Sequence, residues 1–471
     1  RCMIRMLLFS VFLNGNQCKE NPVIYEHHKR YAESGARRYH TPGHKGASEF
    51  EALFPGASLD ITELDFSDNL LCPQGILKEA QELAADCYRV EMCRFVTSGT
   101  TVGNQIMMLV AKRLGGRVLL SRGSHRSLFA ALELFEVPSV FFTDEEEIPA
   151  LLKANPDIAA VIVTYPDYYG RFCQIEALAQ AVHAAGRYLF ADGAQGSHLG
   201  FHERLPAPLS RYCDLYTLSA HKTLPALTQG SYLMCSSQSL FDSVEECREL
   251  LHTTSPSYPI MASLEWAALF MRDSGCERLE QLRRQLAQED LEFRTVRRIE
   301  TPDFTRQVFD FSGLKLREPE LADFFRKRGI VPEILDVDRS VFLLTAMDGP
   351  ESVSALMNAV HELDESVPAR GNSIFSKWFG KRQDGIFPVC ERVCDYLEAV
   401  RAPAEWVPLR RAVGRIAARN VGVYPPGVPL LLAGERIGAD AADYLQRRQA
   451  KLFGNRGNLI RVTAEREGDR I

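Results

Sequence analysis

The sequence has no long apolar run. No stretch reaches the roughly 18 apolar residues that a membrane-spanning helix requires, so we expect no membrane partner. One short apolar run, residues 6–13, follows Arg1 and Arg5, but the segment NGNQC after it offers no small-residue cleavage site for a signal peptide. We therefore expect residues 1–45 to form an N-terminal arm that packs on the rest of the protein.

Cysteine motifs are also missing. The sequence contains 12 cysteines but no CxxC motif. The closest pairs, Cys390/Cys394 and Cys87/Cys93, have no second pair at the spacing of a zinc site. Scattered thiols are typical of proteins in a reducing compartment. We therefore expect a cytoplasmic protein with reduced cysteines and no metal site.

Positive charge is not in excess, because 55 Lys and Arg are opposed by 61 Asp and Glu, giving a formal net charge of −6. A nucleic-acid-binding protein normally has a basic patch or a high pI, so we expect no nucleic-acid partner. The motifs GxGxxG and GxxxxGK(S/T) are absent, which removes the support for a dinucleotide or P-loop site. No repeat of fixed period indicates a solenoid or a propeller.

What the sequence does contain is an alternation of short apolar runs and helical patterns between residues 94 and 235. The runs predict strands over 94–97, 118–121, 159–165, 188–191 and 215–218. The patterns between them predict helices over 102–114, 128–135 and 176–185. This alternation predicts an α/β fold with a mostly parallel sheet and helices on both faces.

The remaining length predicts further units. A long charged helix is expected over 277–300, followed by a strand, helix, strand and helix of a small α+β domain, and then a C-terminal α+β unit. About three domains fit 471 residues. The predicted boundaries are an arm (1–45), a major domain (46–260), a linker helix with the small domain (261–365), a linker (366–388) and a C-terminal domain (389–471).

Polar residues follow the predicted strands. In an open α/β sheet, ligands bind beyond the carboxyl ends of the strands. The tetrad Ser98-Gly99-Thr100-Thr101 follows the first strand and opens a helix, whose free N–H groups attract an anion. The tetrad is therefore a candidate phosphate site, although an ordinary turn with a Thr N-cap has the same pattern.

Three more strand ends carry a candidate group: His125, Asp192 and Lys222. Alone, each has a structural alternative: a loop histidine, a capping carboxylate or a salt-bridged lysine. However, a lysine just past a buried strand is poorly solvated, and the lowered pKa that results suits a Schiff-base lysine. A phosphate site, an imidazole, a carboxylate and this lysine together fit one ligand, pyridoxal 5′-phosphate (PLP).

The residues around Lys222 also carry a family resemblance. The sequence resembles the Orn/Lys/Arg decarboxylase family of fold-type-I PLP enzymes, which have an aspartate-aminotransferase-like fold. The similarity extends over about residues 39–440, and the sequence resembles the shorter members, which are expected to lack the N-terminal wing domain of the large ones. The matching strings are SAHKTLPALTQGS (219–231), YHTPGHKG (39–46), DITELDFSDNLL (60–71), TSGTT (97–101), TTSPSYPIMASL (253–264) and YPPGVPLLLAGE (424–435).

The resemblance implies a role for each matching residue. Lys222 would bind PLP as a Schiff base, Asp192 would hold the pyridine nitrogen protonated, and His125 and Ala194 would pack on the two ring faces. Ser255 and Ser257 resemble a segment that reaches the phosphate of a neighbouring subunit, which implies a homodimer or higher homo-oligomer with shared active sites. The residues implied around the phosphate are Ser98, Gly99, Thr100, Thr101, Ser219 and His221.

The implied activity is that of a lyase of polyamine biosynthesis, which decarboxylates lysine, arginine or ornithine to an amine and CO2. Asp167, Gly193 and Gln195 depart from residues common in the family, which leaves the substrate open. The distal cation of a basic substrate needs an acidic partner, for which Asp167 and Glu435 are candidates. The alternatives are another fold-type-I enzyme such as an aminotransferase or lyase, a non-catalytic PLP-binding protein, and an α/β protein that does not bind PLP.

Overall fold

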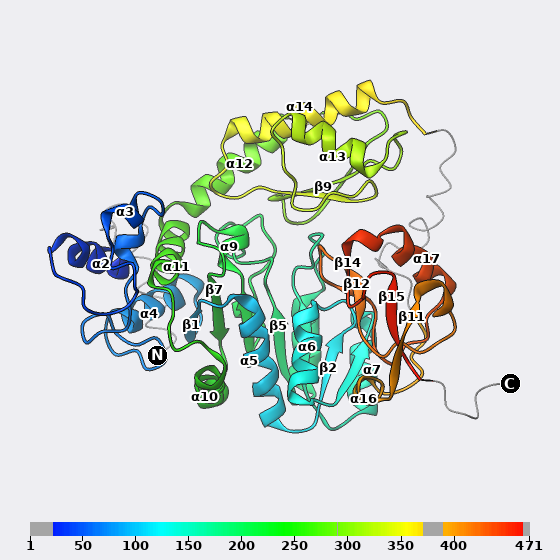
Figure 1. Cartoon of the computed structure of the whole chain (residues 1–471), viewed down its shortest axis with the longest axis horizontal. Coiled ribbons are helices and arrows are strands. Elements are labelled where there is room, and N and C mark those ends of the chain that lie inside the picture. Colours follow the sequence, from blue (N-terminus) through cyan, green and yellow to red (C-terminus); the bar gives the residue numbers. More distant parts are fainter. Residues whose placement is uncertain (1–21, 290, 371–389, 465–471) are drawn as a thin grey trace.

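The computed structural model describes residues 22–289, 291–370 and 390–464. The apolar run at residues 6–13 and most of the predicted linker 366–388 lie outside this range. The described part has a central α/β domain, a smaller domain above it and a C-terminal domain at its side (Figure 1).

A seven-stranded sheet forms the centre of the major domain, in the order β1-β7-β6-β5-β4-β2-β3. The pairs between β3 and β6 are parallel, and β7 runs antiparallel to both of its neighbours. The strands are β1 (Met92–Val96), β2 (Arg117–Ser121), β3 (Ser139–Phe142), β4 (Ile158–Thr164), β5 (Tyr188–Asp192), β6 (Leu215–Leu218) and β7 (Ser231–Cys235). The mostly parallel sheet confirms the predicted fold class, while β3 and β7 are strands that the sequence analysis did not identify.

Helices cover both faces of this sheet because the strand side chains alternate between two cores. In β4, Val161 and Val163 belong to one core, and Ala160 and Ile162 to the other. The helices of the major domain are α4 (Ile76–Tyr88), α5 (Gly99–Leu114), α6 (Arg126–Phe135), α7 (Ile148–Ala154), α8 (Ile175–Ala184), α9 (Ala220–Thr223), α10 (Phe241–Leu251) and α11 (Tyr258–Phe270). The N-terminal helices are α2 (Val23–Glu33) and α3 (Ser48–Glu51).

The small domain has a three-stranded antiparallel sheet in the order β10-β9-β8, covered by helices. Its elements are α12 (Cys276–Gln288), β8 (Arg297–Ile299), β9 (Arg306–Asp310), α13 (Glu318–Lys327), β10 (Ser340–Leu343) and α14 (Pro350–Ser366). The prediction of a helix over 277–300 is wrong in its second half. There the backbone N–H groups of Thr295 and Val296 donate to the Asp364 carboxylate at 2.9 and 2.8 Å, and this tertiary contact holds the chain in a non-helical bend before β8.

The C-terminal domain has two small antiparallel sheets and packs beside β2 and α6 (Figure 1). Its elements are α16 (Tyr396–Arg401), β11 (Ala404–Pro408), β12 (Val421–Val423), β13 (Pro429–Leu431), α17 (Ala439–Arg447), β14 (Leu452–Phe453) and β15 (Leu459–Thr463). A buried ion pair connects this domain to the major domain. The Arg122 guanidinium, just after β2, donates to both Glu435 carboxylate oxygens at 2.9 and 2.8 Å and to the Pro429 carbonyl at 3.0 Å.

In the three described ranges, no helix combines the length and the apolar character needed to cross a bilayer. The ten cysteines that lie in them are all free thiols.

The connection through Arg122 predicts a large effect of Glu435→Ala on stability. Removal of one partner leaves the other charge buried without compensation, which costs about 3–5 kcal/mol of unfolding free energy. Urea denaturation followed by circular dichroism measures this loss. Glu405→Ala is the matched control, because the Arg415–Glu405 pair of the same domain is half exposed at Glu405 and should lose less than about 1 kcal/mol. Equal losses in the two variants would contradict the prediction.

Candidate active site

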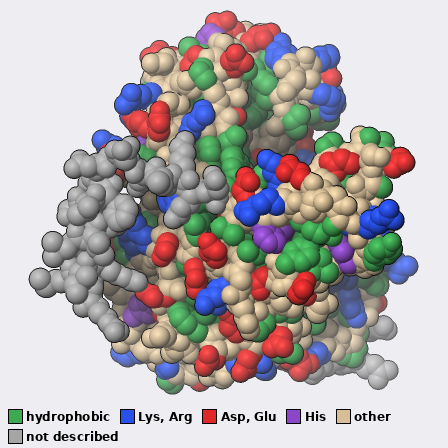
Figure 2. All heavy atoms as spheres, turned by 90° about the vertical axis from the view of Figure 1, so that its left-hand side faces the viewer, with side chains coloured by type: hydrophobic (Ala, Val, Ile, Leu, Met, Phe, Trp, Pro, Cys, Tyr) green, Lys and Arg blue, Asp and Glu red, His purple; other side chains and the backbone are tan. Residues whose placement is uncertain are grey.

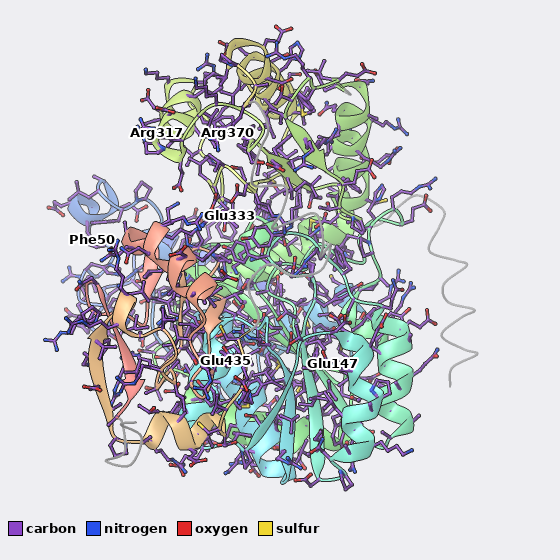
Figure 3. The ribbon with its side chains drawn as sticks, turned by 90° about the vertical axis from the view of Figure 1, so that its right-hand side faces the viewer. Phe50, Glu147, Arg317, Glu333, Arg370 and Glu435 are labelled. Carbon is purple, nitrogen blue, oxygen red and sulfur yellow. The ribbon has the colours of Figure 1, made fainter. Side chains whose placement is uncertain are left out.

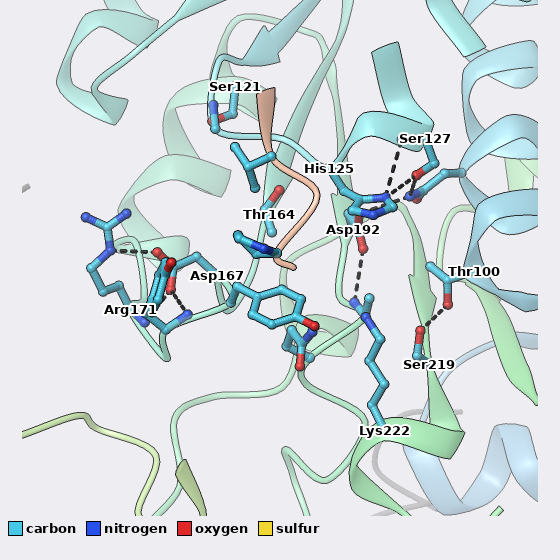
Figure 4. Close-up of a pocket in the computed structure, with 18 of the residues that line it drawn as sticks. Thr100, Ser121, His125, Ser127, Thr164, Asp167, Arg171, Asp192, Ser219 and Lys222 are labelled. Atoms are coloured by element: carbon cyan, nitrogen blue, oxygen red, sulfur yellow. Dashed lines mark hydrogen bonds and ion pairs between the residues drawn. The ribbon is translucent and has the colours of Figure 1, made fainter. Parts of the chain in front are cut away.

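A cavity of about 1020 Å³ lies at the carboxyl ends of the parallel strands (Figure 4). The major and C-terminal domains both contribute to its wall. Ten of the twelve predicted cofactor-binding residues line it: Ser98, Gly99, Thr100, Thr101, His125, Asp192, Ala194, Ser219, His221 and Lys222. The fold thus brings together groups that are 124 positions apart in sequence, from position 98 to position 222.

The N-terminus of α5 forms one end of the cavity. Gly99 opens the helix with φ +76°, a backbone conformation that favours glycine, and its N–H donates to the Gln229 carbonyl at 3.0 Å. The Thr100 hydroxyl is buried between the hydroxyls of Ser219 and Ser231, so it fixes the helix end to β6 and β7. The first turn of a 16-residue helix therefore presents free backbone N–H groups that can bind a phosphate.

Lys222 lies in α9, the short helix that directly follows β6. Burial lowers the pKa of its ammonium group, and this effect is only partly opposed by the negative charges of Asp192 and Glu333. Its Nζ lies 5.5 Å from the centre of the Tyr168 ring. A desolvated lysine with a lowered pKa is suited to attack a carbonyl carbon.

Asp192 ends β5 and is 1% exposed. Its Oδ1 accepts the Ala194 N–H at 3.1 Å, and its Oδ2 accepts from Asn104 Nδ2 at 2.9 Å. A buried carboxylate with these donors is held in one orientation and can receive a protonated ring nitrogen. Asn104 is a residue that the sequence analysis missed, because an asparagine inside a helix belongs to no motif.

His125 is the N-cap of α6 and accepts the Ser127 N–H at its Nδ1. Burial lowers the pKa of its imidazole, although the negative charge of Asp192 acts in the opposite direction and raises it. The C-terminal domain reaches this ring, since the Arg126 N–H donates to the Gly427 carbonyl at 2.9 Å. A Cβ at Gly427 would lie 2.9 Å from His125 Nε2, so the loop and the ring are in close contact.

This C-terminal loop is a second contribution that the sequence analysis missed. Tyr424, Pro426 and Val428 line the cavity. The string YPPGVP was noted for its family resemblance, but no sequence signal placed it against His125. Only the packing of the C-terminal domain does so.

Glu435 is corrected as a candidate partner for a substrate cation. It lies in the C-terminal domain (Figure 3). It is 2% exposed, it is paired with Arg122, and it does not line the cavity. Asp167 does line the cavity, with its Oδ2 accepting from Arg171 Nε at 2.6 Å. Glu333 of the small domain, which the sequence analysis missed, faces the same region and accepts the Tyr168 hydroxyl proton at 2.6 Å.

Two departures from the family pattern have structural explanations. A Cβ at Gly193 would lie 2.6 Å from a Leu209 methyl and 2.8 Å from a Leu218 methyl, so the packing leaves no room for an acidic side chain. The Gln195 carbonyl and Oε1 accept from the buried Arg306 guanidinium at 3.4 and 3.1 Å. Gly193 is therefore required by its packing, and Gln195 accepts hydrogen bonds from a buried guanidinium.

Ser255 and Ser257 lie outside the residues that line the cavity of their own chain, and Ser255 is exposed. Their predicted role at a neighbouring subunit stays a prediction.

The residues present fit PLP. The α5 N-terminus offers donors for a phosphate, Asp192 offers an oriented carboxylate, His125 offers a flat ring, and Lys222 offers a desolvated amine. All four face one cavity, as the constellation in the sequence predicts.

Known proteins resemble this chain over most of its length. The family model for the Orn/Lys/Arg decarboxylase major domain matches residues 22–308, and the model for the C-terminal domain of that family matches residues 388–453. An uncharacterized Bacillus subtilis protein, YaaO, is 29% identical, with 93% of this chain and 96% of that protein covered. A Bacillus subtilis arginine decarboxylase is 25% identical, with 90% and 92% covered.

The fold has solved counterparts. The structure of the Escherichia coli constitutive lysine decarboxylase superposes with a TM-score of 0.76 at 20% identity, covering 94% of this chain and 82% of that one. This likeness confirms the predicted fold-type-I architecture.

The environment of Lys222 predicts an unusual reactivity in the cofactor-free protein. Because its pKa is lowered, a larger fraction of its amine is unprotonated near neutral pH than for an ordinary lysine. Acetylation at a series of pH values, followed by mass spectrometry, should give Lys222 a half-maximal rate at lower pH than the exposed Lys78. A pH profile of Lys222 that coincides with that of Lys78, or lies above it, would refute the prediction.

Proposed function

The chain belongs to the Orn/Lys/Arg decarboxylase family, and we propose that it is a PLP-dependent decarboxylase that removes the α-carboxylate of a basic amino acid as CO2. The observation that carries the proposal is the convergence of Lys222, Asp192, His125 and the α5 N-terminus on one cavity. Relatives named arginine and lysine decarboxylase support the reaction class.

PLP, when bound, supplies the electron sink that takes up the electron pair released as CO2 leaves. The Lys222 amine would be the group that attaches the cofactor covalently and that a substrate amine would replace. The Asp192 carboxylate would hold a proton at the ring nitrogen, which would keep the ring electron-poor. His125 and Ala194 would confine the ring, while the α5 N-terminus would hold the phosphate.

The charge of the cavity wall supports a basic substrate. Besides Asp192, five acidic residues line it, whereas its two arginines, Arg122 and Arg171, are already paired with carboxylates. The acidic residues are Asp144, Glu145, Glu146, Glu147 and Asp167. A substrate with a distal cation can therefore place it near negative charge, which offsets the cost of desolvating it.

The proposed assembly is a homodimer or a higher homo-oligomer with shared active sites. Ser255 is exposed and lies just before α11 in the sequence. Trp266, within α11, is also 41% exposed. The side of the molecule that carries α2, α3 and α11 also shows hydrophobic side chains among charged ones (Figure 2). Apolar surface of this kind is suited to contact a second copy of the chain.

The reaction is tested with purified protein, added PLP, and lysine, arginine and ornithine in parallel. We expect CO2 and the corresponding amine from at least one substrate, and a loss of at least ~10³-fold in kcat for Lys222→Ala, since the attachment point is removed. Lys78→Ala is the control and should keep the wild-type rate.

Other products would identify the alternatives. A keto acid in place of the amine would indicate an aminotransferase, and bound PLP with no product from any of the three substrates would indicate a non-catalytic binding protein. Decarboxylation by Lys222→Ala at the wild-type rate would refute the mechanism.

A further inference from the structure

We propose that Asn104 is a positioning residue that acts through Ser127 to hold His125 as the neutral tautomer protonated at Nε2. The proposal deepens the proposed function, on which it rests for its consequence in catalysis but not for the proton positions themselves.

The side-chain nitrogen of Asn104 bridges two polar groups. Nδ2 lies 2.9 Å from Asp192 Oδ2 and 2.8 Å from Ser127 Oγ. A carboxylate can only accept, so the amide must turn its nitrogen toward Asp192 and not its oxygen. The two protons of that nitrogen are then used, one for each partner.

The hydrogen bond from Asn104 to the Ser127 hydroxyl fixes the direction of the hydrogen bond between Ser127 and His125. Because the Ser127 hydroxyl accepts from Asn104, its own proton is free to be donated to His125 Nδ1, 2.9 Å away. The backbone N–H of Ser127 also donates to Nδ1, at 3.3 Å. Nδ1 therefore receives donors only and carries no proton, which leaves the proton of the neutral ring on Nε2.

Burial keeps water from competing with these hydrogen bonds. Asn104 and Asp192 are each 1% exposed and Ser127 is 5% exposed, so water does not offer alternative partners. Burial also lowers the pKa of His125, which agrees with a neutral ring.

The close approach of α5 to the sheet places Asn104 at this point. A Cβ at Gly103 would lie only 2.4 Å from Thr217 Oγ1, so the residue before Asn104 must be glycine for the helix to lie this close to β6. Asn104 thereby reaches the end of the neighbouring strand, β5, where Asp192 lies.

The tautomer has a consequence for the cofactor. A neutral His125 adds no positive charge beside a ring that must itself carry a proton, and it leaves the negative charge of Asp192 to the ring nitrogen. The Nε2 side of the imidazole lies against Gly427 of the C-terminal domain. One amide thus orients both the carboxylate and the imidazole that the proposed function assigns to the ring.

The test uses the cofactor-free protein with ¹⁵N-labelled histidine, studied by long-range ¹H–¹⁵N NMR at neutral pH. His125→Gln assigns the His125 signals by their disappearance. In the wild type we expect Nδ1 in the unprotonated range and Nε2 in the protonated range. A protonated Nδ1 in the wild type would overturn the proposal.

Asn104→Asp reverses the direction of the hydrogen bonds that lead from position 104 through Ser127 to His125. The new carboxyl oxygen must accept from the Ser127 hydroxyl, which then accepts from His125, so we expect Nδ1 to become protonated. An unprotonated Nδ1 in this variant would overturn the proposal. Asn155→Ala is the control, since the Asn155 amide, just after α7, donates to the nearby Leu151 carbonyl, and the His125 signals should keep their wild-type positions.

If Asn104→Asp does not fold, Ser127→Ala takes its place. It removes the hydroxyl and leaves only the 3.3 Å backbone donor at Nδ1, so a population protonated at Nδ1 should appear. Unchanged His125 signals would overturn the proposal.

A titration of the cofactor-free protein with PLP, followed by absorbance, gives a separate readout. Asn104→Leu should bind PLP about tenfold or more weakly than the wild type, because the buried Asp192 loses a charge-assisted hydrogen bond. The NMR result does not depend on catalysis, so it stands even if none of the three amino acids is a substrate.

Discussion

The buried carboxylate of Asp192 is the constraint on which the site depends. A carboxylate at 1% exposure must be compensated by hydrogen bonds or opposite charge, since its desolvation is costly. The compensation comes from the Ala194 N–H, the Asn104 amide and the nearby charge of Lys222. The close approach of α5 to the sheet and the orientation of His125 follow from the same set of contacts.

The other two domains shape the cavity around this carboxylate, the C-terminal domain as part of its wall and the small domain through contacts with residues that line it. The C-terminal domain is held by the Arg122–Glu435 pair, and its loop closes over His125. The small domain is held by Arg306, which is buried at the start of β9 and donates to the Tyr168 carbonyl at 2.7 Å and to Gln195. Because Tyr168 and Gln195 line the cavity, its shape depends on contacts between domains as well as on the central sheet.

Much of the fold could be predicted from the sequence where one local signal dominates. The apolar runs of the parallel strands are such a signal, and their ends agree with the structure to within about two residues. The helix predicted over 277–300 shows the limit, because a pattern of charged residues does not reveal that Asp364, far along the chain, holds residues 295 and 296 in a non-helical bend. The prediction for Glu435 failed for the same reason, since its partner Arg122 is more than 300 positions away.

The sequence by itself determined the class of fold and the chemical groups of the site. Strand periodicity is local, and the groups that follow each strand must meet at one edge of a parallel sheet, so the sequence alone predicts that Lys222, Asp192, His125 and the tetrad at residues 98–101 lie together. Only the tertiary structure decided which neighbours hold these groups. The amide of Asn104, the loop at Gly427 and the burial of Glu435 against Arg122 arise from packing between elements distant in sequence, and such contacts leave no periodic signal in the chain.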